Sequence, residues 1–164
     1  MTYNLGANGS LSQQILNKVI KKWLESIGFQ ALVTGDKHEF VVPVKDIFSI
    51  KSYHIPDVVG IRNSSVVVVE TETRLDEIYE AIVKCLIWKT MATWVYLALP
   101  TKICRNLEVL RTYGIGLLCV SEKKVREIIE LPKERSESLP IFELHPWDPQ
   151  REQELFRQIK RHSK

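Results

Sequence analysis

Apolar residues near the start of the chain recur every three to four positions, a spacing typical of one face of a helix. The pattern runs from Ile15 to Ile27. Ser10 or Ser12 can cap the first turn, because a serine hydroxyl there accepts a backbone N–H. Gly28 can end the helix. We therefore expect an amphipathic helix that closes before residue 28.

Segments rich in β-branched and aromatic residues follow, and they predict strands. The first two are separated by the turn-like residues 34–37. The third is expected to continue the same sheet and to lead into a central hairpin. The predicted strands cover residues 29–33, 40–44 and 47–53.

The stretch 55–74 has the composition of a β-hairpin. Two β-rich segments flank the polar residues 62–65. The second segment contains the valine run 66–69, which is typical of a strand covered on both faces. If the turn is centred between Asn63 and Ser64, residues at equal distances from this centre lie opposite each other on the two strands. A loop of another length would shift this register.

The register places Asp57 opposite Glu70. Directly opposed Cβ atoms lie roughly 5 Å apart, so two like charges there destabilise the sheet. Glu72 is expected on the same side as Glu70, because side chains alternate along a strand. Three carboxylates would then converge, and a divalent cation that prefers oxygen ligands is their simplest partner. The alternative is a set of ordinary solvated acids, although charge beside the buried valine run would be costly.

After residue 72 the apolar residues again recur at the spacing of a helix. The expected buried stripe consists of Leu75, Ile78, Tyr79, Ile82, Val83, Leu86 and Ile87. The elements that follow are a strand at 94–99, a helix at 102–113 and a strand at 114–120. Strand, helix and strand in this order favour a right-handed crossover. The sequence therefore predicts an α/β fold in which a mixed β-sheet is flanked by helices on both faces.

The end of the chain is predicted to extend this core. Ser121 can cap a short amphipathic segment that runs through Ile129. A charged, serine-rich segment at 132–140 is expected to be a mobile connection, followed by an edge strand at 141–144. Asp148 before a proline is typical of the start of a helix, and we expect a final helix with a basic end.

Length and composition fit a single domain. The chain has 164 residues, of which 45% are apolar and 26% are charged. We assign residues 12–120 to the core and residues 121–164 to a C-terminal extension. No stretch approaches the roughly 20 apolar residues of a membrane span, and the N-terminus lacks the apolar core of a signal peptide. We therefore expect a cytoplasmic protein without a membrane partner.

The cysteines suggest neither a disulfide framework nor a zinc site. Cys85, Cys104 and Cys119 are widely spaced, odd in number and without a C-x-x-C pair. We expect them to be small buried apolar residues.

The charges are distributed unevenly, although the net charge is only +3. Residues 57–100 contain six acids and four bases, and the regions around them have a basic excess. A basic surround would attract phosphates to an acidic, metal-binding centre, whereas the alternative is a mixed, solvated surface. The candidate nucleic-acid contacts are Lys18, Lys21, Lys22, Arg62 and Arg74.

The sequence I-P-D-V-V at 55–59, followed by a short turn and an apolar run that ends in E-T-E at 70–72, resembles the signature of the PD-(D/E)xK nuclease superfamily. Archaeal Holliday-junction resolvases look closest. The resemblance covers roughly residues 12–120 and implies a restriction-endonuclease-like fold. It implies that Asp57 and Glu70 bind Mg²⁺ or Mn²⁺ and that Thr71 lends its backbone carbonyl. It also implies a symmetric homodimer that acts on branched DNA.

The chain departs from the family pattern in two places. Glu72 stands where the family usually has a lysine, and it could serve as a base or a second metal ligand. Lys84 lies one turn before Trp88, where many relatives place helical residues that face the active site, so it could supply the positive charge. Its alternative role is an i,i+4 pair with Glu80. An acid that the first helix often contributes is replaced by Asn17 or Gln14.

These observations lead to two functional hypotheses. The first is a metal-dependent endonuclease that hydrolyses DNA, with Asp57, Glu70, Glu72 and Lys84 as catalytic residues. The second is a catalytically inactive nuclease-fold protein that binds nucleic acid or acts as a scaffold. His54, close to the acids in sequence, is another candidate contact for metal or substrate, although a single histidine is more often structural.

Overall fold

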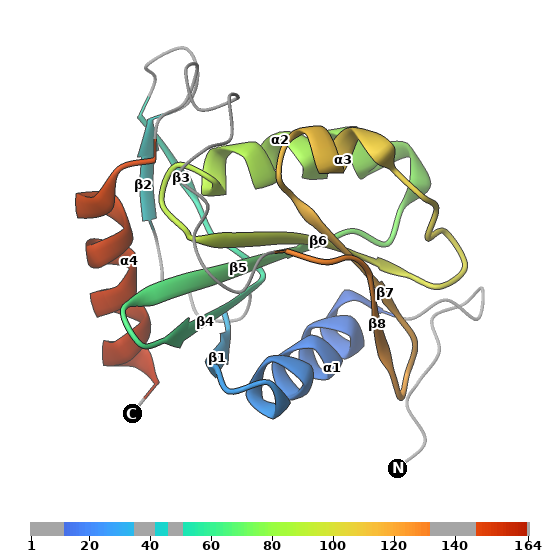
Figure 1. Cartoon of the computed structure of the whole chain (residues 1–164), viewed down its shortest axis with the longest axis horizontal. Helices are drawn as coiled ribbons and strands as arrows, with labels where there is room; N and C mark the ends of the chain where they lie inside the picture. Colours follow the sequence, from blue (N-terminus) through green and yellow to red (C-terminus); the bar gives the residue numbers. More distant parts are fainter. Residues whose placement is uncertain (1–11, 35–41, 46–50, 132–146, 164) are drawn as a thin grey trace.

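Six strands form one mixed sheet across the molecule (Figure 1). The computed structural model describes residues 12–34, 42–45, 51–131 and 147–163. The sheet has the order β1-β4-β5-β6-β7-β8, and β5, β6 and β7 are parallel while the other neighbours are antiparallel. Its strands are β1 (Gln30–Val33), β4 (Val58–Arg62), β5 (Ser65–Thr71), β6 (Trp94–Pro100), β7 (Gly116–Val120) and β8 (Val125–Ile129).

Helices cover both faces of this sheet, as the sequence predicted (Figure 1). On one face α1 packs against β1, β4 and β5, and on the other face α2, α3 and α4 share a second apolar core. The central strands β5 and β6 lie between the two cores and are almost wholly buried, which explains their continuous apolar runs. The helices are α1 (Gln13–Ser26), η1 (Leu75–Glu77), α2 (Ile78–Trp88), α3 (Glu108–Thr112) and α4 (Pro149–His162).

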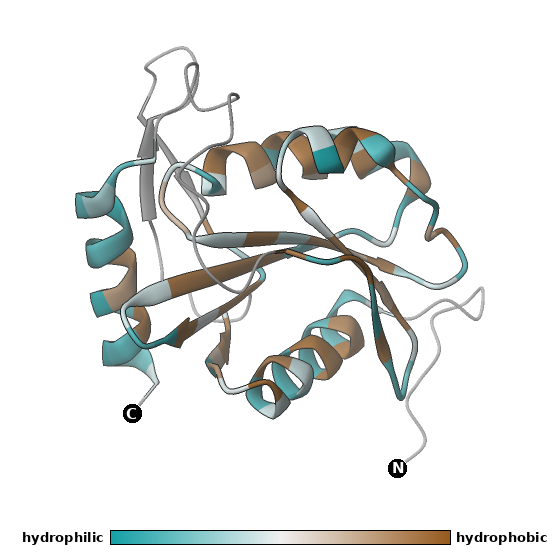
Figure 2. Ribbon diagram, viewed as in Figure 1, coloured by the Kyte–Doolittle hydropathy of each residue, from teal (hydrophilic) through white to brown (hydrophobic). Residues whose placement is uncertain are grey.

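The first helix follows its sequence signals. The hydroxyl of Ser12 accepts a hydrogen bond from the backbone N–H of Ile15, and the helix ends before Gly28, whose φ of 96° favours glycine. Apolar side chains of α1 face the sheet and polar ones face outward (Figure 2). The predicted helix is confirmed. So is the predicted cap of the last helix, because the carboxylate of Asp148 accepts the N–H of Gln150.

The central hairpin has the predicted register. Asn63 adopts a positive φ of 56° in the turn, and the ladder pairs Arg62 with Ser65. At its other end Val58 pairs with Val69. Continued by one residue beyond β4, this register sets Asp57 opposite Glu70, and the two carboxyl groups are close enough to interact.

Two predicted strands and one predicted helix have different roles from those expected. β2 (Val42–Lys45) and β3 (Lys51–His54) form a separate two-stranded sheet, so residues 51–53, the described part of the predicted strand 47–53, do not continue the main sheet. The segment 121–129 is not a helix, because β8 returns antiparallel to β7. Ser121 accepts the N–H of Lys124 through its hydroxyl, but the chain reverses there instead of coiling.

The expected helix at 102–113 is shorter, and α3 begins only at Glu108. The backbone N–H groups of Ile103 and Cys104 instead bond to the carbonyl of Pro100 in a turn. Cys104 forms a disulfide with Cys119 on β7, across a Cα–Cα distance of 5.7 Å. The expectation of no disulfide is therefore wrong, whereas Cys85 is buried as expected.

The buried face of α2 is narrower than the predicted stripe. Leu75, Tyr79 and Val83 are 47%, 81% and 50% exposed. They recur at i,i+4 spacing along η1 and α2 and form one exposed apolar row. The side chains that do pack inward are Ile78, Ala81, Ile82, Cys85 and Trp88.

Some expectations fall outside the described residues, namely those for 132–140 and 141–144, and the side chain of His54 is not described either. Among the helices that the structure describes, none is long and apolar enough to cross a membrane.

Candidate functional site

Residues from four elements meet where β5 ends. Asp57 directly precedes β4, and Glu70 and Thr71 are the last residues of β5. Glu70 faces Trp88 of α2, whereas the hydroxyl of Thr71 faces Asn17 of α1, as alternation along a strand requires. The site therefore lies at one end of the sheet, between the helices of its two faces.

The carboxylate of Asp57 is held by hydrogen bonds on both of its oxygens. Oδ2 accepts the backbone N–H of Thr71 at 2.8 Å and lies 3.1 Å from its hydroxyl. Oδ1 accepts from Nε2 of Gln13 at 3.0 Å. Asn17, which is only 5% exposed, accepts the hydroxyl of Thr71 through Oδ1 at 3.0 Å. Asp57 is thus fixed in orientation by groups from α1 and β5.

Glu70 is a buried acid beside another acid. It is 4% exposed, and its Oε1 accepts the indole N–H of Trp88. Burial, followed by the neighbouring Asp57, raises the pKa of Glu70 well above its usual value, while Trp88 and then the charge of Lys84 act in the opposite direction. Burial and Asp57 therefore favour the protonated form of Glu70 more than in an exposed glutamate.

Glu72 does not join these two acids. Its Oε1 accepts the backbone N–H groups of Thr73 and Arg74, each at 2.8 Å. β5 ends at Thr71, and the alternation that would have directed Glu72 beside Glu70 ends with it. The expected cluster of three acids is therefore wrong, and within the described ranges no group of three or more His, Cys, Asp or Glu side chains could hold a metal ion.

Lys84 forms the pair with Glu80 that was its alternative role, and its catalytic role stays a prediction. Its Nζ lies 3.8 Å from Oε1 of Glu80 in an i,i+4 pair. Its charge is also close enough to Glu70 to lower the pKa of that acid. The side chain of Lys84 is 41% exposed.

The basic residues that were predicted to contact nucleic acid lie in different surroundings. Lys21 pairs with Glu25 at 2.6 Å, and Arg74 pairs with acids on its own short helix. Arg62 donates to the carbonyl of Ile27 and lies over the ring of Phe29, 4.3 Å from its centroid. Lys18 and Lys22 line a groove beside α1.

The sequence did not indicate Gln13. It left open whether Asn17 or Gln14 stands where the family has an acid on the first helix. In the structure Gln13 and Asn17 contact the site, and Gln14 is exposed. The available signal was their i,i+4 spacing near the start of the helix, which puts both on one face. Trp88 sits at the position that the resemblance marked as facing the site, and it contacts Glu70.

Comparisons with known proteins define the fold only. No protein-family model matches the chain, and no curated protein matches its sequence. Among solved structures, the SPO1766 protein of unknown function from Silicibacter pomeroyi matches with a TM-score of 0.61 and 16% identity, over 99% of this chain and 88% of that chain. The protein of unknown function AF1548 matches with a TM-score of 0.45 and 15% identity, over 65% of this chain and 57% of that chain. The first match supports the α/β architecture and carries no information on activity.

Proposed function

We propose that the chain is a metal-dependent nuclease of the PD-(D/E)xK type, with a restriction-endonuclease-like fold, that hydrolyses phosphodiester bonds of DNA. The observation that carries this proposal is the register of β4 and β5, which sets Asp57 beside Glu70 at the end of a buried strand. These are the two acids that the family signature assigns to the metal. The site also lies at the carboxyl ends of the parallel strands, where open α/β sheets usually bind ligands.

The donor groups fit a magnesium or manganese ion. Both acids are oxygen donors, and Mg²⁺ is commonly held by one or two carboxylates together with waters and substrate phosphates. The closeness of Asp57 raises the pKa of buried Glu70, and a cation between the two would remove that repulsion. The backbone carbonyl of Thr71 remains the proposed third ligand.

Each protein group would have a separate part in hydrolysis. A bound ion would polarise the scissile phosphate and lower the pKa of its water. Asp57 is held in place by Gln13 and Thr71, so its carboxylate would need little reorganisation. Glu70 would release its proton to become a ligand, and Trp88 would keep the carboxylate in position through its indole N–H.

The absent family lysine requires another source of positive charge. We assign that part to Lys84, whose charge already acts on Glu70 across the site. It would stabilise the charge that develops on the phosphate. Glu72 would act as a base or ligand only after leaving its bonds to the N–H groups of Thr73 and Arg74.

A second candidate function is binding of nucleic acid, or scaffolding, without catalysis. It is favoured by Asn17, which stands on α1 where the family often has an acid, and by Glu72, whose carboxylate accepts the N–H groups of Thr73 and Arg74. A chain that lost catalysis would keep the fold and the basic residues while these two positions changed.

Cleavage assays on branched DNA, linear DNA and RNA, with and without Mg²⁺ or Mn²⁺, separate the two candidates. We expect cleavage of DNA that requires the ion and is abolished by Asp57→Asn. Asp76→Asn, which changes an exposed acid on the neighbouring short helix, is the matched control and should cleave normally. Binding of DNA without cleavage under every metal condition would favour the inactive protein.

The resemblance also leads us to propose a homodimer, and the cytoplasmic location expected from the sequence stays a proposal. Resolvases of the resembled type act as symmetric pairs on branched DNA, in which two phosphodiester bonds are cut. Analytical ultracentrifugation with and without a branched DNA measures the state of this chain. A monomer under both conditions would contradict the dimer.

A further inference from the structure

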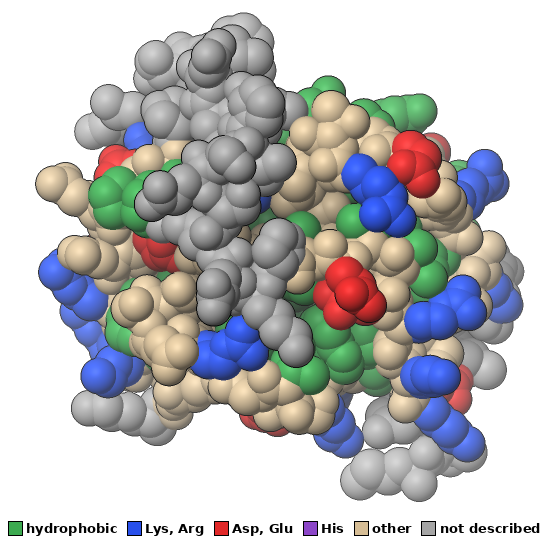
Figure 3. Space-filling view, viewed as in Figure 1, with side chains coloured by type: hydrophobic (Ala, Val, Ile, Leu, Met, Phe, Trp, Pro, Cys, Tyr) green, Lys and Arg blue, Asp and Glu red, His purple; other side chains and the backbone are tan. Residues whose placement is uncertain are grey.

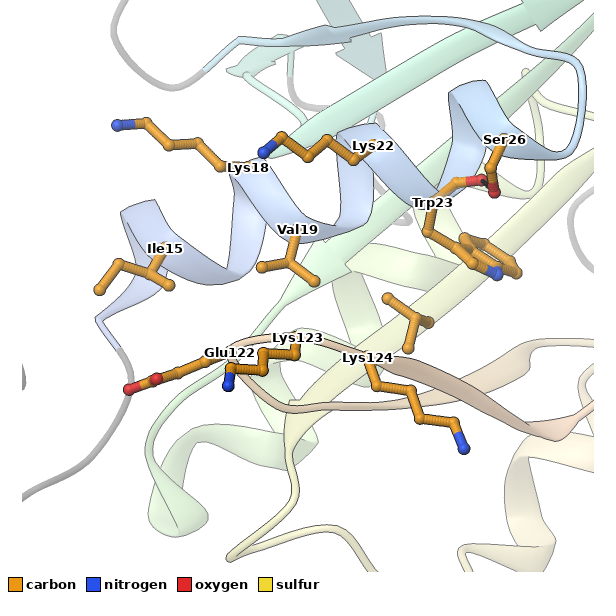
Figure 4. Close-up of a pocket in the computed structure, with 10 residues that line it drawn as sticks. Ile15, Lys18, Val19, Lys22, Trp23, Ser26, Glu122, Lys123 and Lys124 are labelled. Atoms are coloured by element: carbon orange, nitrogen blue, oxygen red, sulfur yellow. Dashed lines mark hydrogen bonds between the residues drawn. The ribbon is translucent and has the colours of Figure 1, made fainter. Parts of the chain in front are cut away.

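A groove with a volume of about 520 Å³ runs between α1 and the turn that joins β7 to β8. Lys18 and Lys22 stand on the α1 side, and Lys123 and Lys124 stand on the turn opposite (Figure 4). Lys and Arg side chains are also prominent over the end of the β7–β8 hairpin in the space-filling view (Figure 3). Glu122 is the acid on the rim.

The four lysines outnumber the acid Glu122, so the residues that line the groove have an excess of positive charge. Lys18 and Lys22 lie at i,i+4 spacing, where like charges destabilise a helix. Across the ranges that the structure describes, none of the four ammonium groups lies in an ion pair; Lys21, between the first two, has Glu25 for a partner. An occupant that complements this groove would therefore carry several negative charges.

The inner part of the groove is apolar and contains an aromatic ring. Val19 points from α1 toward the turn, and Trp23 lies further along the same helix (Figure 4). Trp23 is half-buried, and its ring meets the ring of Tyr96 edge to face, with centroids 5.8 Å apart. A positively charged groove with an aromatic surface is the combination by which proteins bind single-stranded nucleic acid, because the phosphates meet cations and a base meets the ring.

The groove lies next to the acid pair. Thr71, Ala98 and Leu118 are aligned across β5, β6 and β7, so the turn after β7 projects beyond the same end of the sheet as the acids. Neighbouring strands are about 4.8 Å apart, which places β7 roughly 10 Å from β5. On α1, Lys18 directly follows Asn17, which contacts the site.

We propose that this groove binds a single-stranded segment of nucleic acid, with phosphates on the four lysines and a base on Trp23. The inference rests on the proposed function in one respect, namely that the bound strand would lead to Asp57 and Glu70. A double helix fits the groove less well, because its bases are stacked inside and could not reach a half-buried ring. The preferred substrate would accordingly have a single-stranded arm or an opened junction.

Fluorescence anisotropy with a labelled oligothymidylate of about 12 nucleotides tests the groove. The measurement is made on the full chain carrying Asp57→Asn, in EDTA and at low salt, so that cleavage plays no part. Lys22→Glu combined with Lys124→Glu should weaken binding by about tenfold or more, since contacts from both rims are reversed. The control pair is Lys160→Glu with Arg161→Glu, exposed on α4 at the other face of the sheet, and it should have a much smaller effect.

The contact between a base and the ring of Trp23 can be measured separately by tryptophan fluorescence. Binding should quench tryptophan fluorescence, and Trp23→Phe should remove most of that quenching, because Trp88 and Trp94 are buried and Trp147 lies beside α4, where it bonds to Glu152. Trp23→Leu keeps an apolar side chain but cannot stack, and it should weaken binding to the oligothymidylate several-fold. A matched duplex of the same length should bind more weakly than the single strand.

Several results would overturn the inference. Equal binding by the double variant in the groove (Lys22→Glu with Lys124→Glu) and the double variant on α4 would exclude the groove as the site. A duplex, or vesicles containing phosphatidylserine, bound as tightly as the single strand and unaffected by Trp23→Leu, would show a general anion-binding surface. A chain that binds the oligothymidylate through the groove but never cleaves DNA would support the inference and overturn the proposed nuclease. If the chain cleaves DNA while the double variant in the groove binds the oligothymidylate normally, the nuclease would be supported and the inference about the groove overturned.

Discussion

Glu70 is the residue at which burial and charge are most strongly opposed. Its carboxyl is removed from water and lies beside Asp57, and both effects raise its pKa. The neighbouring thiol of Cys85 experiences the same field: burial, then Glu70 and then Asp57 raise the pKa of that thiol. Such an acid can be neutral with a proton or charged with a cation beside it. Under the proposed function, a metal ion bound here would therefore replace the proton of Glu70.

The first prediction concerns the pH dependence of stability without metal. The folded chain holds the proton of Glu70 more tightly than the unfolded chain, whose pKa is near 4.5. The resulting stabilisation is complete below that pH and is lost as the pH rises through the higher folded pKa. In this window the free energy of unfolding should fall with pH, and Glu70→Gln, which cannot ionise, should remove that part of the fall.

Denaturant unfolding at a series of pH values, in the presence of a chelator, measures the effect. Glu154→Gln, at an exposed position on α4, is the control and should keep the slope of the unaltered chain. Parallel slopes for the unaltered chain and Glu70→Gln would mean that Glu70 ionises at its ordinary pKa.

The second prediction is that binding of Mg²⁺ or Mn²⁺ releases a proton. Ligation requires the ionised form of Glu70, so the affinity should increase with pH until that group is ionised. Calorimetric titrations in two buffers of different ionisation enthalpy report the number of protons released. Asp57→Asn should weaken binding and Asp76→Asn should not. Unchanged affinity in Asp57→Asn would remove that residue from the metal site.

The acid pair was predictable from the sequence, whereas its surroundings were not. The turn at Asn63 fixed the register, and register alone places Asp57 opposite Glu70. The contact of Gln13 depends on where α1 packs against β5, which is a tertiary relation. The error at Glu72 has a local cause, because the rule of alternating side chains applies only while the strand continues.

Elements were predicted well where a local signal marks both ends. The first helix has a capping serine and a closing glycine, and the final helix has an aspartate cap followed by proline. The segment 121–129 was misassigned, because a serine that accepts an N–H three residues later occurs in turns as well as at helix starts. Pairing with β7 decided its structure, and that pairing is not visible in the segment itself.

The disulfide provides a prediction at the scale of elements, because it joins the turn after β6 to β7. Cys104 and Cys119 are separated by 15 residues, and closing a loop of that length should stabilise the fold by about 3 kcal/mol. Reduction should lower the free energy of unfolding by this order, and Cys104→Ala should do the same.

Thiol titration of the unfolded chain gives an independent check. After purification without reductant we expect one reactive thiol, from Cys85, and after reduction all three. The variant Cys104→Ala should be insensitive to reductant in the unfolding assay. Three reactive thiols under oxidising conditions would show that the pair stays reduced.

The whole molecule combines two apolar cores that share one sheet. The alternation of strands and helices after residue 72 was sufficient to predict the mixed sheet with helices on both faces. The sequence order did not reveal that β1 pairs with β4 while β2 and β3 form a sheet of their own. Such long-range choices depend on which faces can be buried together, and local composition does not determine them.

The C-terminal helix is connected to the centre of the molecule through one buried acid. Glu152 is 4% exposed, and its Oε1 accepts the backbone N–H groups of Val66 at 3.0 Å and Thr93 at 2.9 Å. Its Oε2 accepts the indole N–H of Trp147 at 2.8 Å. Leu155 and Ile159 of the same helix lie in the core shared with α2. We therefore expect residues 147–163 to unfold together with the sheet.

The last prediction tests this coupling. Glu152→Ala removes the acceptor of the backbone N–H of Val66 and of the hydroxyl of Thr93, at about 1–3 kcal/mol for each group, whereas the N–H of Thr93 keeps the carbonyl of Val66 as an acceptor. We expect a total loss of about 3–5 kcal/mol. Glu154→Ala is the matched control on the same helix, since its partner Arg157 is exposed, and it should cost less than about 1 kcal/mol. Unfolding should remain a single transition by both near-ultraviolet and far-ultraviolet circular dichroism. A separate early transition that Glu152→Ala alone affects would instead make the C-terminal helix an independent unit, attached to a core that is stable without it.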